Sequence, residues 1–207
     1  MCHNSLPKPD ESSRNPVFSD MQTIKRRFFA MRNGALAAQM RAGGLVYKIN
    51  FGLNLPQIRE IASEIMSWNL PDDSQCSLAE NLWANTTTRE SMLIAPMIYP
   101  TAIMTPHTAM QWACQAQTTE IADTLCHSLL RKLPFAGEIA AELLSLNSQS
   151  DMTRYTALRL WLNLLVSGLA DTDGLEDAAC AERDRSCPLT RSLTRQILDE
   201  IDFLKSE

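Results

Sequence analysis

The chain has 207 residues, of which 45% are hydrophobic and 21% are charged, and its net charge is −5. This length and balance exclude a chain too polar to fold, and they are typical of one globular domain with a full hydrophobic core. No run approaches the roughly 20 apolar residues of a membrane-spanning helix, and the first residues lack the apolar segment of a secretory signal. We therefore expect a cytoplasmic protein that does not associate with membranes.

The hydrophobic spacing predicts helices along most of the chain. Residues 1–18 are polar, contain three prolines and are expected to be a disordered lead-in, followed by a single domain over 19–207. The first helix should end at Gly43-Gly44, and Asn54, Thr105 and Thr118 should cap later helices. Helices are predicted over 20–42, 56–68, 77–85, 88–98, 106–114, 120–133, 135–146, 151–166, 175–181 and 188–205.

No stretch of the sequence is predicted as a strand. About ten helices, each with an apolar stripe and short connections, must stack against one another to bury those stripes. The pattern favours an all-α fold of the α-solenoid type, an α-α superhelix of degenerate HEAT-like repeats, because no strict repeat period is visible. A compact helical bundle is the structural alternative.

A basic segment near the N-terminus contrasts with the acidic remainder of the chain. Residues 21–59 contain no acid, although the whole chain is net negative. The basic residues in this segment are Lys25, Arg26, Arg27, Arg32, Arg41, Lys48 and Arg59. This concentration of positive charge indicates a surface that faces a polyanion. Alternatively, the same residues form the solvated faces of ordinary amphipathic helices.

The sequence contains no recognisable cofactor or metal motif. It lacks a glycine-rich phosphate-binding loop, a nucleophile elbow and an HExxH motif, so we expect no cofactor. Glu120, Asp123 and His127 share one helix face, but a hydrogen bond between Asp123 and His127 is a simpler use of that spacing than a metal site. The six cysteines have no zinc-binding spacing and are predicted to be free thiols.

Several segments, in this order, resemble one known family. They are FGLNLPQIREIA (51–62), LWANTTTRESMLIA (82–95), and TEIADTLCHSLL (119–130) followed by RYTALRLWLNLL (154–165). The order and spacing are similar to those of the AlkD-like DNA alkylation repair family, whose members are HEAT-like repeat proteins. The resemblance covers about residues 20–166 and implies the fold of a HEAT-like DNA glycosylase.

The resemblance also implies a chemistry. Active members of the family release cationic N3- and N7-alkylated purines by hydrolysis of the N-glycosidic bond. The family's catalytic aspartate corresponds to Asp123, which would stabilise the positive charge that develops on the sugar. The family's aromatic position corresponds to Thr119, and its later arginine corresponds to Tyr155, so two of the three expected side chains are substituted.

The resemblance and the basic segment together point to double-stranded DNA as the partner of a monomeric protein. The candidate contacts to the DNA backbone are Arg26, Arg27, Arg32, Arg41, Lys48, Arg154 and Arg159. The substitutions at Thr119 and Tyr155, with the net negative charge, leave a second interpretation open. In that interpretation the chain is a non-catalytic HEAT-like scaffold that binds a protein partner or an altered nucleic-acid structure.

Overall fold

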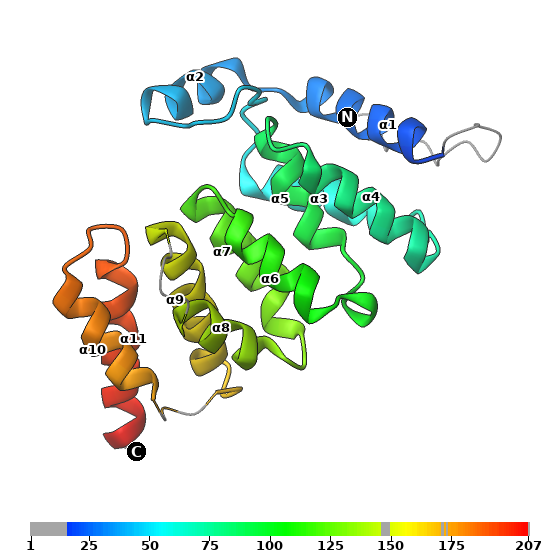
Figure 1. The fold of residues 1–207 in the computed structure, drawn as a ribbon. Coiled ribbons are helices and arrows are strands. Elements are labelled where there is room, and N and C mark those ends of the chain that lie inside the picture. Colours follow the sequence, from blue (N-terminus) through cyan, green and yellow to red (C-terminus); the bar gives the residue numbers. More distant parts are fainter. Residues whose placement is uncertain (1–15, 146–149, 171, 173, 207) are drawn as a thin grey trace. The chain divides into compact units, whose positions relative to one another are not determined.

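The structure, a computed structural model, describes residues 16–145, 150–170, 172 and 174–206. Over these residues the chain is helical, and the strand-type pairing it shows is one isolated parallel bridge between Ile49 and Thr88. The prediction of an all-α fold is confirmed, and the succession of helices is consistent with a helical-repeat solenoid (Figure 1). The predicted lead-in lies outside the described residues up to position 15, and the first helix begins at Pro16.

The chain divides into two compact units, one ending at Ile103 and the other beginning at Met104. Unit 1 contains α1 (Pro16–Met31), α2 (Gly34–Ala42), α3 (Leu55–Met66), α4 (Asp72–Ala84), α5 (Arg89–Ile98) and the 3-10 turn η1 (Thr101–Ile103). Unit 2 contains α6 (Pro106–Gln115), α7 (Thr119–Ser128), the 3-10 turn η2 (Leu130–Lys132), α8 (Ala136–Ser145), α9 (Asp151–Val166), α10 (Leu175–Arg185) and α11 (Arg191–Ser206).

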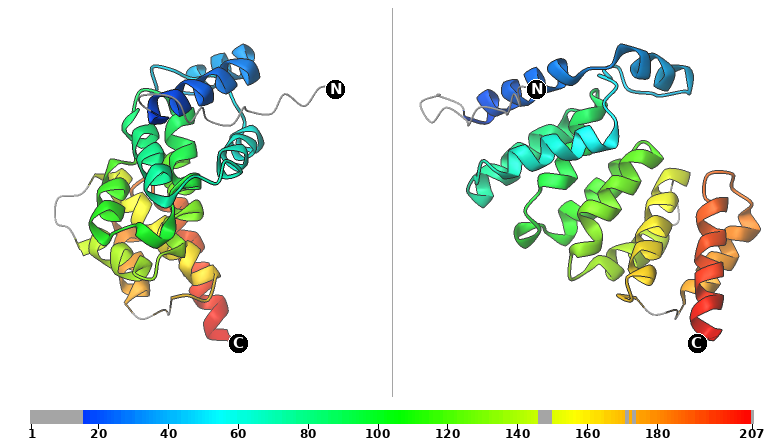
Figure 2. Two further views of the ribbon diagram at one scale, coloured as in Figure 1. Left: turned by 90° about the vertical axis from the view of Figure 1, so that its right-hand side faces the viewer. Right: turned by 180° about the vertical axis from the view of Figure 1, so that it is seen from behind.

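One helix forms the centre of each unit. In unit 1, α5 packs against α3 and α4, and its residues Met92–Ala95 are completely buried. In unit 2, α9 contacts α6, α7, α8 and α11, and α10 packs on α11; Figure 2 shows this unit from two further sides. Because α9 is surrounded by other helices, its leucines are buried on several faces of the helix rather than along one stripe.

The helix caps predicted at Asn54, Thr105 and Thr118 are confirmed. Asn54 forms a capping box with Gln57, in which each side chain accepts a hydrogen bond from the backbone N–H of the other residue. The hydroxyls of Thr105 and Thr118 accept from the backbone three residues later, at Thr108 and Ile121. These bonds satisfy N–H groups that have no partner within the first turn of a helix.

The long helix predicted over 20–42 is wrong, because it is broken into α1 and α2. The break falls at Arg32 and Asn33, where the Asn33 side chain accepts a hydrogen bond of 3.0 Å from the N–H of Leu36 and caps α2. The N–H of Asn33 in turn donates to the carbonyl of Phe51 at 2.8 Å. An asparagine side chain competes with helical hydrogen bonding, and here a distant segment reinforces the break.

Several other boundaries also differ from the prediction. Helix α4 begins at Asp72, not at Ser77, with Asp72 and Asp73 in its first turn, where negative charge interacts favourably with the helix dipole. The helix predicted over 120–133 ends at Ser128 and continues as a 3-10 turn. Helix α10 runs to Arg185, beyond the predicted end at 181, and α11 begins at Arg191 instead of 188.

The structure also bears on the predictions about membrane spans and cysteines. None of the helices in the described part of the chain is both long and apolar enough to cross a membrane. Five of the six cysteines are described, and all five are free thiols, as predicted. They are Cys76, Cys114, Cys126, Cys180 and Cys187, whereas Cys2 lies outside the described residues.

Candidate functional site

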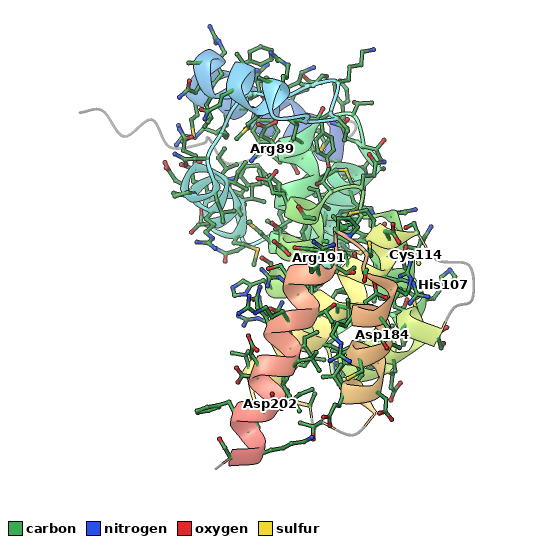
Figure 3. The ribbon with its side chains drawn as sticks, turned by 90° about the vertical axis from the view of Figure 1, so that its left-hand side faces the viewer. Arg89, His107, Cys114, Asp184, Arg191 and Asp202 are labelled. Carbon is green, nitrogen blue, oxygen red and sulfur yellow. The ribbon has the colours of Figure 1, made fainter. Side chains whose placement is uncertain are left out.

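A buried ion pair lies in unit 1, where two of the segments that carry the family resemblance, 51–62 and 82–95, meet. Arg89 and Glu90 begin α5 and are 2% and 0% exposed, and the Arg89 Nη1 lies 3.3 Å from the Glu90 Oε1. The same carboxylate oxygen accepts hydrogen bonds from the backbone N–H groups of Phe51 and Leu53, at 3.0 and 3.4 Å. Arg89 also donates to the carbonyl of Leu53 at 2.9 Å. Figure 3 labels Arg89 among the helices of this unit.

The segment between α2 and α3 is therefore held in place without being a helix or a strand. Its Ile49 pairs with the chain just before α5, donating to the Thr87 carbonyl at 2.9 Å and accepting from the Arg89 N–H at 3.2 Å. The Phe51 ring packs on Phe28 and Phe29 of α1, with ring centroids 5.4 and 4.9 Å apart. These contacts give the basic N-terminal part of the chain a fixed position on α5.

Most of the predicted DNA-contacting residues of unit 1 lie on the surface. Arg26 of α1, Arg32 in the break after α1, Arg41 of α2 and Lys48 after α2 are exposed. Within the part of the chain that the structure describes, Arg26, Arg41 and Lys48 form no ion pair, and Arg32 donates to the carbonyl of Phe29. Their charges are therefore available to an external anion.

Arg27 is placed differently from Arg26, the neighbouring arginine of α1. Its Nη2 lies 2.9 Å from the Glu60 Oε1 and 2.8 Å from the Glu64 Oε1, both on α3, and its side chain is only 14% exposed. Two carboxylates within hydrogen-bonding distance neutralise this guanidinium and attach α1 to α3. Arg27 is therefore an internal link within unit 1.

The candidate site in unit 2 surrounds Asp123. This residue lies on α7, and two side chains of α9 bind the same carboxylate oxygen. The Tyr155 hydroxyl donates to Oδ1 at 2.9 Å, and the Arg159 Nε lies 2.8 Å from it. Because Tyr155 and Arg159 are four residues apart, they share one face of α9. Asp123 remains 36% exposed, so its carboxylate is held firmly yet can be reached from solvent.

Tyr155 acts as a hydrogen-bond donor in this arrangement. Burial and the neighbouring Asp123 carboxylate both raise the pKa of the phenol well above its usual value. The hydroxyl therefore keeps its proton at neutral pH and donates a hydrogen bond to Asp123. Cys126, one turn along α7, is completely buried, and burial raises the pKa of its thiol, so this cysteine is not a nucleophile.

Two other residues predicted for this site, Thr119 and Arg154, are not among the side chains that bind Asp123. Thr119 is the first residue of α7 and is partly exposed. The Arg154 Nη1 lies 3.4 Å from the Glu182 Oε2 of α10. Glu182 is buried and also binds Arg185 and the Thr190 hydroxyl, so Arg154 belongs to a network that joins α9 to α10 and to the residue before α11.

The pairing of Arg159 with Asp123 was not predicted from the sequence. Sequence reasoning places Arg159 only on the DNA backbone, four positions from the place where the family resemblance expects an arginine. One feature of the sequence could have indicated this pairing: Tyr155 and Arg159 are four residues apart, so both lie on one face of the helix. In three dimensions the cation at Asp123 comes from the next turn of α9.

A groove of about 680 Å³ continues from this arrangement within unit 2. Arg159, His127 and Arg131 lie on the α7–α9 side, and Asp199 and Glu200 lie on α11. Its walls therefore carry both signs of charge. In the described residues no group of three or more histidine, cysteine or acidic side chains is arranged to hold a metal ion.

Comparisons with known proteins identify the family of the chain. A family model described as DNA alkylation repair enzyme matches residues 24–182, which is most of the chain. The chain belongs to the DNA alkylation repair family. Comparisons with curated proteins and with solved structures gave no match.

Membership of the DNA alkylation repair family connects the two features described above. The matched region begins at Ile24 in α1 and ends at Glu182 in α10, so it contains both the basic surface and the Asp123 arrangement. The family supports a role in DNA alkylation repair and an interaction with DNA.

Proposed function

We propose that this DNA alkylation repair family protein binds duplex DNA and releases N3- or N7-alkylated purines, with Asp123 as the charge-stabilising carboxylate. The observation that carries the proposal is the fixed, partly exposed carboxylate of Asp123, bound by Tyr155 and Arg159. A structural ion pair on a helix surface does not need a buried tyrosine to orient it, whereas a catalytic carboxylate benefits from being held in one position.

The chemistry suits a single oriented carboxylate. An alkylated purine already carries positive charge, so it leaves without protonation and positive charge develops on the deoxyribose. A carboxylate beside the sugar stabilises that charge and can orient the attacking water. Tyr155 and Arg159 both bind Oδ1, so we assign Oδ2 to the sugar or the water. The side chain of Thr119 offers no aromatic face, so charge supplies most of the recognition at this site.

The DNA backbone is assigned to the arginines and lysine whose charges are not neutralised within the described part of the protein. In unit 1 these are Arg26, Arg32, Arg41 and Lys48. In unit 2, Arg159 pairs with Asp123 through Nε, and its Nη groups are assigned to a phosphate next to that site. Arg27 and Arg154 are omitted because Glu60, Glu64 and Glu182 bind them. Exposed cations release counterions from DNA when they bind phosphate, which makes the affinity depend on salt.

Asp123→Asn is expected to slow the release of methylated purines from alkylated duplex DNA by about 100-fold, because the amide carries no charge to stabilise the sugar. Single-turnover base release, measured by chromatography, tests this. Glu138→Gln, an exposed carboxylate of α8, is the matched control and should release bases at the wild-type rate. Equal rates for Asp123→Asn and the wild type would exclude Asp123 from the reaction.

Arg26→Glu combined with Arg41→Glu is expected to weaken binding to duplex DNA and to lower the slope of log affinity against log salt by about two, because each arginine neutralises one phosphate. Fluorescence anisotropy at several salt concentrations measures both quantities. The control with the same change of charge is Arg183→Glu with Arg195→Glu, on exposed faces of α10 and α11. If both pairs have the same effect, only net charge matters and the assigned surface is wrong.

A second candidate function is favoured by exposed apolar side chains in unit 2. Val166 at the end of α9 and Phe203 of α11 are 63% and 55% exposed, and both line the groove of unit 2 that also contains Arg159. Large exposed apolar side chains often mark a surface for a protein partner. A chain that neither releases methylated bases nor binds DNA in these assays would support this non-catalytic, protein-binding function.

A further inference from the structure

Unit 1 contains a groove that neither the proposed chemistry nor the proposed DNA-backbone contacts use. It lies between α1, α4 and the beginning of α5, has a volume of about 650 Å³, and is closed at one side by Ile49 and Phe51. This volume is within the range of pockets that bind small molecules, roughly 300–1,000 Å³. The site around Asp123 belongs to unit 2 and shares no residue with this groove.

The lining of the groove combines an apolar base with polar walls. Ile24, Phe28 and Leu82 are at most 2% exposed and form a fixed apolar surface, while Phe18 lies at the rim and is 61% exposed. The polar lining residues are Gln22, Lys25, Ser77, Asn81, Asn85, Thr88 and Ser91. A purely apolar ligand would leave those of these polar groups that are not bonded within the protein without hydrogen bonds, so the groove suits a ligand with both apolar and polar parts.

The polar groups differ in whether they are already satisfied. Asn85 donates to the Ser91 hydroxyl at 3.2 Å and accepts from the Thr88 hydroxyl at 3.3 Å, so this wall is fixed by its own bonds. Asn81 donates to the Ser77 carbonyl at 2.7 Å, which leaves its side-chain oxygen as an acceptor. Gln22 and the exposed Lys25 make no hydrogen bond or ion pair within the described part of the chain.

The charge of the groove selects the sign of the ligand. Among the described residues that line it there is no aspartate or glutamate, and Lys25 is its charged residue. An ammonium group without a neighbouring carboxylate favours an anionic group such as a phosphate. An aromatic side chain at the rim offers a face for a planar ring, and amide side chains form paired hydrogen bonds with the edges of nucleobases.

We infer that this groove binds a nucleotide, with the base against the apolar surface and Phe18, its edge facing Gln22 and Asn81, and its phosphate on Lys25. The ligand is either a free mononucleotide or an unstacked nucleotide of a nucleic-acid strand, since both present the same chemistry. Because unpaired bases separate easily from a strand, such a site would bind preferentially where a duplex is interrupted. The inference does not depend on base release at Asp123.

The four deoxynucleoside 5′-monophosphates, titrated into the full-length protein by calorimetry, test the site. We expect at least one to bind with a micromolar to millimolar Kd, and Lys25→Glu to weaken that binding at least about fivefold. Arg59→Glu is the matched control, because it makes the same change of charge on an exposed residue of α3 outside the groove. Phe18→Ala, at an exposed position, should also weaken binding while leaving the fold intact.

Two outcomes would overturn the proposal. One is that none of the four nucleotides binds, and the other is that Lys25→Glu and Arg59→Glu weaken nucleotide binding equally. Competition identifies the source of the ligand. A duplex with one unpaired nucleotide that displaces the mononucleotide better than a fully paired duplex does supports a strand. Displacement by neither duplex supports a free nucleotide. Asp123→Asn should bind mononucleotides as the wild type does, so failure of the groove and failure of the proposed reaction are separate results.

Discussion

Gly52→Ala is expected to lower the free energy of unfolding by about 3–5 kcal/mol. Gly52 has a φ of +72°, in the left-handed region that side chains with a Cβ rarely adopt. A Cβ built on it would lie 2.1 Å from the carbonyl oxygen of Asn33 and 2.7 Å from the backbone nitrogen of Ala37. Both obstructing atoms belong to backbone at the start of α2, so no side chain can turn away to make room.

The measurement for Gly52→Ala is urea denaturation followed by circular dichroism. Gly34→Ala, in the first turn of α2, is the control, because no atom of the described residues lies within 4 Å of the added Cβ. Alanine has a better helix propensity than glycine, so this control should keep or raise stability by up to about 1 kcal/mol. A Gly52→Ala variant as stable as Gly34→Ala would mean that α2 does not pack against this segment in solution.

Glu90→Gln is expected to destabilise the protein by about 3 kcal/mol, because it leaves the buried charge of Arg89 without its carboxylate. Glutamine keeps an oxygen that can accept from the N–H groups of Phe51 and Leu53, so the substitution isolates the loss of charge. The Glu90 Oε2 has no hydrogen-bond partner among the described residues. The amide NH2 group that replaces this oxygen in Glu90→Gln would lie in the same surroundings.

Glu90→Leu separates the second role of this carboxylate. Leucine removes the acceptor as well as the charge, so two buried backbone N–H groups lose their partner, at about 1–3 kcal/mol each. We therefore expect Glu90→Leu to be clearly less stable than Glu90→Gln in urea denaturation. Glu80→Gln, an exposed carboxylate of α4, should change stability by less than about 0.5 kcal/mol. Equal stability of the two Glu90 variants would contradict the bonds to Phe51 and Leu53.

The helical class and the caps could be predicted because their causes are local. Asn54, Thr105 and Thr118 each bond a backbone N–H within three residues, so the neighbouring sequence contains the whole interaction. The break at Asn33 also has a local component, but Phe51 completes it from a segment eighteen residues away. Hydrophobic spacing alone does not contain that interaction, and the prediction of one continuous helix failed there.

The candidate site was predictable in part. Asp123 followed from the family resemblance, and the structure places it where two side chains of α9 hold it. The cation beside it depends on how α7 packs against α9, which fixes the turn of α9 that faces the carboxylate. The sequence likewise could not distinguish Arg26 from Arg27, adjacent residues of which only Arg27 faces the carboxylates of α3.

The segment between α2 and α3 also limits how the length of this chain can vary. Connections without regular structure usually accept inserted residues, because few backbone bonds depend on their length. Here Ile49, Phe51 and Leu53 are each bonded to the beginning of α5. An added residue would shift the positions of these alternate residues. It would thereby separate the Glu90 carboxylate from the backbone N–H groups of Phe51 and Leu53. The backbone of the connection from Ser67 to Asn69 bonds to the preceding turn of α3, so residues added after Asn69 would break none of these bonds.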